Sequence, residues 1–199
     1  MSKGERTKRK ILTMAKEHIL SKGYTATSIR QIADSVGITP AAIYTHFSGK
    51  EEIFTALIEE AAPIDAVLSF LETIQANDAD DLIRSTLQHL INLAISHEDY
   101  FRLALIDAQE RNGVSLSRFL PKVLPAALSY YQRLLSLSDK QSRLRDISPF
   151  LFMRGMISLI IGYVMTERIV RSSEALQIPE INWDQGLTNI FMHGVLETS

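Results

Sequence analysis

The chain has 199 residues, which suffices for one or two domains with a sizeable core, and its 46% hydrophobic and 22% charged residues are ordinary for a folded globular protein. It contains no cysteine, which excludes a disulfide framework, a thiolate metal site and a cysteine nucleophile. The first ten residues are polar and basic with no apolar stretch behind them. They therefore do not form a secretory signal, and we expect a cytoplasmic protein.

The formal net charge of −2 hides an asymmetry along the chain. Residues 1–50 contain nine Lys or Arg and three acidic residues, a net charge of +6, whereas the remainder carries −8. A local excess of positive charge suits binding to phosphate groups, and a solvated basic tail is the alternative. Because the same segment carries the most specific motif of the chain, we favour phosphate binding.

Nearly the whole chain has the apolar period of helices, and no stretch shows the sustained alternation of a strand. The first predicted helix covers Thr7–Leu20 and ends before Gly23. The fourth opens at Ser48, where Glu51 completes a capping box. Pro63 removes a backbone donor, which predicts a kink or break near Ala61–Pro63.

Five more helices are predicted after this break, from the apolar period and from flanking Gly, Pro, Asn and Asp residues. They cover approximately residues 80–96, 98–111, 117–137, 149–170 and 184–195. The most apolar stretch, Leu151–Met165, is interrupted by Arg154 and is too short to span a bilayer, so we expect a buried helix and no membrane partner. The sequence thus predicts an all-α protein of about nine helices.

The most specific pattern lies within residues 28–47, where two short helices are separated by a tight turn. Gly37 can adopt the left-handed conformation that ends the first of them. Thr39 is a suitable N-cap and Pro40 suits the first position of the second helix, which would run from Thr39 to Phe47. This is the pattern of a helix-turn-helix, whose second helix enters the major groove of DNA.

The same residues resemble the N-terminal signature of the tetracycline-repressor (TetR) family of transcriptional regulators. The resemblance runs from about Thr7 to about Leu57 and is carried by Gly23–Ala33, Val36–Ile38 and Ile43–Ile53. It implies a helix-turn-helix DNA-binding domain over residues 1–47. A C-terminal domain for effector binding and dimerisation would cover residues 48–199, and the helix that starts near residue 48 would link the two.

The resemblance also implies which side chains meet DNA. Phosphate contacts would come from Thr27 or Ser28, for which plain helix capping is the alternative, and from Tyr44, His46 and Lys50. Arg30 would reach a guanine edge or a phosphate, with plain solvent exposure as the alternative. The bases would be read by a small, apolar face without a bidentate Arg, Asn or Gln. That face consists of Thr39, Pro40, Ala41, Ala42 and Thr45.

One such domain makes few contacts, so we expect a homodimer on palindromic double-stranded DNA, with half-sites one helical turn of about 34–36 Å or a multiple apart. The last two predicted helices carry the apolar candidates for the subunit interface, and core packing is the alternative for each. The candidates are Ile157, Ile161, Val164, Met165, Phe191, Met192 and Val195.

Members of the family usually release DNA when a small molecule enters the C-terminal bundle, so an effector of unknown identity is implied. Ordinary packing is the alternative for every candidate lining residue. These are Phe70, Gln88, Asn92, Phe101, Leu105, Tyr130, Tyr131, Phe150, Arg154 and Tyr163. A buried Arg154 would need an anion, from Asp107, Glu110, Glu167 or a ligand carboxylate.

Three functions fit these observations unequally. A ligand-responsive repressor fits best, and a DNA-binding protein of the same fold with a non-transcriptional or ligand-independent role would lack an effector cavity. The third is an enzyme or carrier. We identify no nucleophile, metal-binding or phosphate-loop arrangement, and therefore expect neither an enzyme nor a cofactor or metal.

Overall fold

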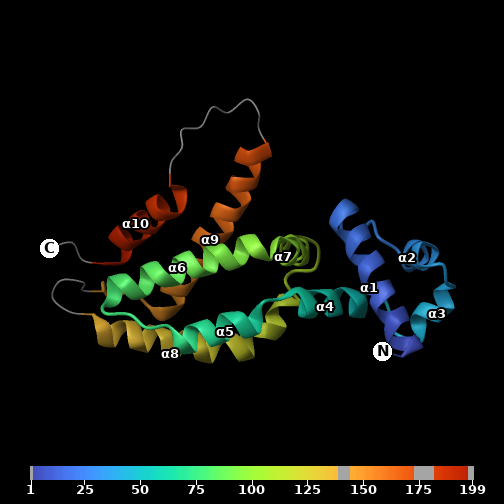
Figure 1. Cartoon of the computed structure of the whole chain (residues 1–199), viewed down its shortest axis with the longest axis horizontal. Helices are drawn as coiled ribbons and strands as arrows, with labels where there is room; N and C mark the ends of the chain where they lie inside the picture. The colour runs from blue at the N-terminus through green and yellow to red at the C-terminus, as the bar shows by residue number, and fades with distance from the viewer. Residues whose placement is uncertain (1, 139–143, 173–181, 197–199) are drawn as a thin grey trace. The chain divides into compact units, whose positions relative to one another are not determined.

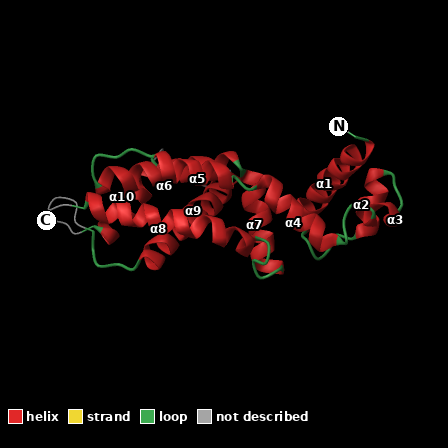
Figure 2. Ribbon diagram, turned by 90° about the horizontal axis from the view of Figure 1, so that it is seen from below, coloured by secondary structure: helices red, strands yellow, loops and turns green. Residues whose placement is uncertain are grey.

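A computed structural model describes residues 2–138, 144–172 and 182–196, and all regular secondary structure in these ranges is helical (Figure 1, Figure 2). The predicted all-α fold is confirmed. The fourth predicted helix is two helices, α4 (Lys50–Ala61) and α5 (Ile64–Thr73). The break lies at Pro63, as predicted, because proline cannot donate the hydrogen bond that would continue the helix.

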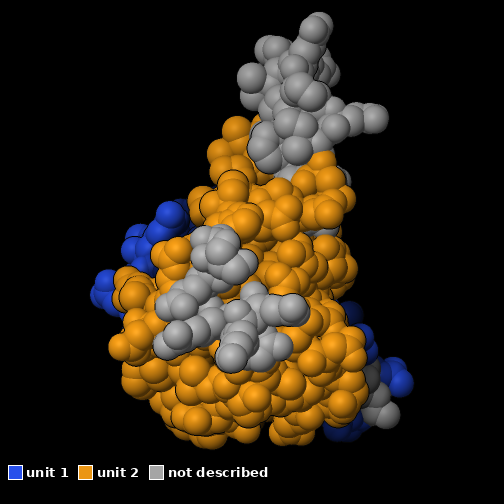
Figure 3. All heavy atoms as spheres, turned by 90° about the vertical axis from the view of Figure 1, so that its left-hand side faces the viewer, with its two compact units in different colours: residues 1–62, 97–120 blue, residues 63–96, 121–199 orange. Residues whose placement is uncertain are grey.

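The chain divides into two compact units, coloured separately in Figure 3. Unit 1 consists of residues 1–62 and 97–120, and unit 2 of residues 63–96 and 121–199. The chain therefore passes from one unit to the other three times. The first boundary between the packing units lies after residue 62, whereas the sequence predicts a boundary between functional domains after residue 47. The division into functional domains stays a prediction.

Unit 1 has its own hydrophobic core, in which α1 packs against three of the other helices of the unit. Its elements are α1 (Lys3–Lys22), α2 (Ile29–Val36), α3 (Pro40–Tyr44), α4, α7 (Glu98–Glu110) and the 3₁₀ helix η1 (Leu116–Phe119). Full burial of one large aliphatic or aromatic side chain contributes about 1.5–3 kcal/mol. Side chains with 0% exposure come from five helices, for example Ile11, Ile32, Ile43, Phe54 and Leu103.

Two helix starts in unit 1 differ from the prediction because of their caps. Helix α1 begins at Lys3, since Ser2 and Glu5 form a capping box in which each side chain accepts the other residue's N–H, at 2.6 and 3.2 Å. The capping box expected from Ser48 and Glu51 is wrong. Gly49 is the N-cap of α4, and the N–H of Ser48 donates to Glu52 at 2.6 Å.

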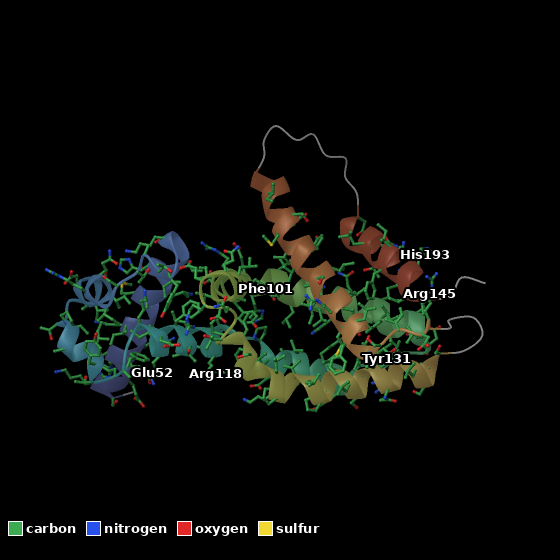
Figure 4. The ribbon with its side chains drawn as sticks, turned by 180° about the vertical axis from the view of Figure 1, so that it is seen from behind. Glu52, Phe101, Arg118, Tyr131, Arg145 and His193 are labelled. Carbon is green, nitrogen blue, oxygen red and sulfur yellow. The ribbon has the colours of Figure 1, made fainter. Side chains whose placement is uncertain are left out.

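Unit 2 is a bundle in which α6 packs against α9 and α10, and α9 packs against α10. Aromatic rings join three of its helices. Tyr131, labelled in Figure 4, lies with its ring centroid 5.5 Å from that of Phe152, and Phe152 lies 5.7 Å from Phe191. The helices of unit 2 are α5, α6 (Ala79–Ser96), α8 (Leu120–Leu137), α9 (Pro149–Ser172) and α10 (Trp183–Val195).

Most residues of the apolar helix α9 are exposed or half-buried, so the prediction of a buried helix there is wrong. Its segment Pro149–Glu167 has a mean hydropathy of 1.5 and is only 17% buried. By length and composition this segment could cross a membrane. That is weak evidence for a membrane span, because core helices of soluble proteins can be equally long and apolar. The exposed apolar side chains of α9 are Phe150, Leu151, Ile157, Met165 and Ile169.

Candidate nucleic-acid interface

Helices α2 and α3 are joined by the tight turn that the sequence predicts. Gly37 is left-handed, with φ 78° and ψ 35°, and its N–H donates to the carbonyl of Ala33 at 3.0 Å. Thr39 then accepts the N–H of Ala42 at 3.2 Å and caps α3. At the start of α2, Ser28 and Gln31 form a reciprocal capping box. These caps satisfy backbone donors that the helices themselves leave unpaired.

The outer face of α3 is open to solvent, as the helix-turn-helix pattern predicts. Tyr44 is 57% exposed, whereas Ile43 and Phe47 are buried in the core of unit 1. The regular helix ends at Tyr44 and is shorter than the predicted Thr39–Phe47, although the N–H of Phe47 still reaches the carbonyl of Ile43 at 3.0 Å. Of the remaining predicted contact residues, Thr39, Pro40, Ala41 and Thr45 are exposed, while Ala42 and His46 are half-buried.

The two threonines on this face keep complementary hydrogen-bonding capacity. The hydroxyl of Thr39 accepts a backbone N–H, which leaves its proton free to donate. The hydroxyl of Thr45 donates to the carbonyl of Ala42 at 2.8 Å, which leaves its lone pairs free to accept. A base acceptor suits the first and a base amino group suits the second.

Near the start of α2, two of the predicted DNA-contacting residues are exposed and one is buried. Ser28 and Arg30 are exposed. Thr27 is only 2% exposed, and its hydroxyl donates to the carbonyl of Gly23 at 2.8 Å. The hydroxyl of Thr27 therefore closes the turn between α1 and α2 in this conformation, and of the two residues Ser28 remains the candidate for a phosphate contact.

Lys50 also serves the turn between α1 and α2. Its Nζ donates to the carbonyls of Tyr24 and Thr27, each at 2.8 Å, and lies 4.1 Å from the centroid of the Tyr24 ring. Burial lowers the pKa of Lys50, an effect opposed by nearby Glu110. An ammonium group has three donors, so one N–H remains for a phosphate.

The first turns of α1 bring further basic side chains to the same end of unit 1. The ammonium of Lys8 lies 5.3 Å from the centroid of the Phe47 ring, at the turn between α3 and α4. Gly4 lies beside His46, since a Cβ built on it would be 3.9 Å from Cε1 of that histidine. The sequence analysis noted the positive charge of residues 1–50 but assigned no DNA contact to the cations of α1. The exposed cations are Lys3, Arg6, Lys8, Arg9 and Lys10.

Arg111, the residue that caps the C-terminus of α7, is a buried arginine that sequence reasoning missed. The Arg111 side chain is 5% exposed and pairs with Asp107 and Glu51, in each case at 3.0 Å. The rings of Tyr24 and Phe54 flank its guanidinium at 5.0 and 4.9 Å. The sequence did indicate this ion pair, because Asp107 and Arg111 are four residues apart on a predicted helix.

The predicted effector-binding residues differ in exposure and belong to both units. Arg154, expected to be buried, is exposed, as are Gln88, Asn92 and Phe150. Tyr130 and Tyr131 are buried and donate to the carbonyls of Leu82 and Ile147, so both serve the core of unit 2. Phe101 and Leu105 belong to α7 of unit 1, and they are half-buried, as are Phe70 and Tyr163 in unit 2.

The predicted dimer residues divide in the same way. Ile157 and Met165 are 56% and 42% exposed on α9, but Met192 and Val195 are buried at 4% and 7%. The assignment of these last two to an exposed interface is wrong for the single chain, because they face the core of unit 2. Ile190, which is 69% exposed on α10, was missed. The half-buried members of the predicted set are Ile161, Val164 and Phe191.

Comparisons with known proteins agree with this geometry. The sequence profile described as "Bacterial regulatory proteins, tetR family" matches residues 11–57. The HTH-type transcriptional regulator TcmR of Streptomyces glaucescens is 36% identical over 73 residues, which are 37% of this chain and 31% of TcmR. The chain therefore matches less than a third of the length of that relative.

Two other comparisons cover more of the chain. The HTH-type transcriptional regulator UidR of Escherichia coli K12 is 26% identical over 164 residues, 82% of this chain and 76% of UidR. The crystal structure of native NalD, the secondary repressor of the MexAB-OprM multidrug efflux pump in Pseudomonas aeruginosa, is 20% identical. It superimposes with a TM-score of 0.66 over 98% of each chain, a likeness of fold.

Proposed function

We propose that this chain, whose residues 11–57 match the model of the tetR family of bacterial regulatory proteins, is a homodimeric, cytoplasmic, DNA-binding transcriptional regulator, most simply a repressor that a small molecule releases from its operator. The observation that carries the DNA-binding part is the exposed face of α3 beside the basic first turns of α1 in one compact unit. Small side chains on α3 contact base edges, and cations on α1 neutralise phosphates.

The phosphate contacts in this proposal come from groups that keep a free donor. Ser28 and Arg30 act from the start of α2, Tyr44 and His46 from the end of α3, and Lys50 through its third N–H. These contacts fix the orientation of the protein on the duplex without reading sequence. Sequence preference then comes from Thr39, Thr45 and the small residues between them.

The proposed dimer forms through the exposed apolar face of α9. Large apolar side chains recur along this helix, and exposed apolar patches of this kind mark interaction sites. Gly162 lies on the same helix, and a Cβ built on it meets no atom within 4 Å, so a partner helix can approach closely there. Gly155 serves the single chain instead, since its Cβ would lie 3.1 Å from Phe191.

The proposed effector site lies in unit 2, where one polar atom supports it. The buried Nε2 of His89 has no hydrogen-bond partner among the residues that the structure describes, and the His89 ring stacks on Phe70 with centroids 3.7 Å apart. An unpaired buried nitrogen costs about 1–3 kcal/mol, which a bound hydrogen-bonding molecule would offset. Helix α5, which carries Phe70, has no fully buried residue although most of its side chains are apolar.

Selection of bound sites from random double-stranded DNA tests the DNA-binding proposal. The full chain should enrich an inverted repeat whose half-site centres lie one helical turn, about 34–36 Å, or a multiple apart. A chain whose Lys3, Arg6 and Lys10 are all replaced by Gln provides the control, and it should bind the same sequence more weakly. Failure to enrich any sequence would contradict the proposal.

The effector proposal needs a separate measurement. The complex of the chain with its selected duplex is titrated with a panel of small aromatic and hydrogen-bonding molecules, and release of DNA is followed by fluorescence anisotropy. A compound that releases wild-type protein should release His89→Leu far less well. A compound that acts equally on both proteins would place its site elsewhere.

A further inference from the structure

Residues from other helices of unit 1 form hydrogen bonds with both the backbone N–H groups and the backbone carbonyls of the turn between α1 and α2. The carboxylate of Glu110, from α7, accepts the N–H of Tyr24 at 3.2 Å and the N–H of Thr25 at 2.6 Å. Lys50, from α4, donates to the carbonyls of Tyr24 and Thr27. The turn leads directly into Ser28, the cap of α2, so its position sets where α2 begins.

The sequence makes room for this contact at Gly23. Its φ is +88°, a conformation that favours glycine, and a Cβ built there would lie 2.7 Å from Oε1 of Glu110. Hydrogen bonds from Thr25 lower the pKa of Glu110, so the carboxylate is charged at neutral pH. Two further contacts tie α7 to α1: Lys16 pairs with Asp99 at 2.7 Å, and Arg102 donates to the carbonyl of Leu20 at 2.8 Å.

From these contacts we propose that Glu110 is a positioning residue for DNA binding: by holding the N–H groups of Tyr24 and Thr25, it fixes the start of α2 in the orientation that the duplex requires. The proposal rests on the proposed DNA-binding function. Glu110 touches the turn and not the DNA. Segment 97–120, which lies outside the helix-turn-helix in sequence, thereby becomes part of the DNA-reading unit.

Whether Glu110→Gln strengthens or weakens DNA binding distinguishes a positioning role from a purely electrostatic one. Glu110 places a negative charge in the unit that binds a polyanion. If that charge acted only through space, its removal would strengthen DNA binding. If Glu110 positions the turn, Glu110→Gln weakens binding, because a neutral amide offers one oxygen and loses the charge-assisted hydrogen bonds.

The test uses the full chain and the duplex selected by wild-type protein. We expect E110Q to bind about tenfold more weakly, with an unchanged dependence of affinity on salt, because no phosphate contact is lost. Glu17→Gln is the matched control: Glu17 is an exposed carboxylate on α1 of the same unit, and its removal should leave binding unchanged or slightly tighter. Amide hydrogen exchange should show that Thr25 loses protection in E110Q while the core of α1 stays protected.

The outcomes are separable. E110Q that binds as tightly as wild type, or more tightly, overturns the positioning role while leaving DNA binding intact. E110Q that binds more weakly but keeps full protection of the Thr25 amide also overturns it, since the loss would not arise from the turn. Wild-type protein without affinity for any duplex overturns the proposed function, and this inference with it.

Discussion

Arg111 and Asp107 form an ion pair of 3.0 Å at the C-terminal end of α7, and their side chains are 5% and 0% exposed. Asp107 also accepts the N–H groups of Ser115 and Leu116, each at 3.0 Å, so one carboxylate closes the turn that follows the helix. In that turn Asn112 and Gly113 have φ of 55° and 72°. The pair thereby fixes α7 and the residues after it within unit 1.

Arg111→Met should destabilise the protein by about 3–5 kcal/mol, because it leaves the buried charge of Asp107 without its partner. Arg118→Met is the matched control. Arg118 pairs with Glu59 at 3.5 Å, but both side chains are more than half exposed, and an exposed pair contributes about 0–1 kcal/mol. Urea denaturation measures both free energies of unfolding. Equal losses in the two variants would rule out a structural role for the buried pair.

Lys50→Ala should weaken binding to specific and unrelated duplexes by similar factors. The variant loses a phosphate contact, so the slope of log affinity against log salt should fall by about 1. Fluorescence anisotropy at several salt concentrations measures the slope, and E110Q serves as the comparison because it should leave the slope unchanged. If the slope of Lys50→Ala equals that of wild type, Lys50 acts on the turn alone and makes no phosphate contact.

Ile157→Glu should convert the proposed dimer to a monomer, because it puts a charge on the apolar face of α9. The monomer should also lose most of its affinity for the palindromic site, since only one reading unit remains. Leu135→Glu is the control, because Leu135 is 44% exposed on α8, outside this face. Sedimentation velocity reports the oligomeric state. A dimeric Ile157→Glu would place the subunit interface elsewhere.

Acid should destabilise unit 1 through its hydrogen-bonded carboxylates. Hydrogen bonds from Ser48 lower the pKa of Glu52, and those from Thr25 lower the pKa of Glu110, from the usual value of 4.5. A carboxyl group with a lowered folded-state pKa stabilises the protein above 4.5, and this contribution is lost as the pH falls below that value.

Thermal unfolding on both sides of this pH tests the assignment. E110Q should show a shallower fall in midpoint temperature below pH 4.5 than wild type, because one of the titrating groups is gone. Parallel curves for the two proteins would mean that Glu110 contributes nothing to the acid sensitivity.

The sequence predicted the parts of the structure that local chemistry decides. Gly37 and Thr39 specify the turn and cap between α2 and α3, and Pro63 specifies the break after α4. The early start of α1 was also readable, because Ser2 and Glu5 have the spacing of a capping box. Local pattern carries this information, since each residue acts on its immediate neighbours along the chain.

What the sequence did not reveal depends on which distant segments pack together. Nothing in Glu110 itself indicates that it reaches the backbone of Thr25, 85 residues away. Lys50 and Thr27 were assigned to phosphate, but two of the three donors of Lys50 and the hydroxyl of Thr27 serve the carbonyls of a turn. The period of α9 predicts an apolar helix, yet which of its faces stays exposed depends on where α6 and α10 pack.

The central claim, that two copies of α3 read base edges symmetrically, is tested most directly by changing one residue on its exposed face and repeating the selection from random DNA. Thr45→Asn introduces an amide that pairs bidentately with adenine. We predict that adenine becomes preferred at one position in each half-site, related by the two-fold axis, while the other positions keep their preferences. An enriched sequence identical to that of wild-type protein would contradict the claim that this face reads the bases.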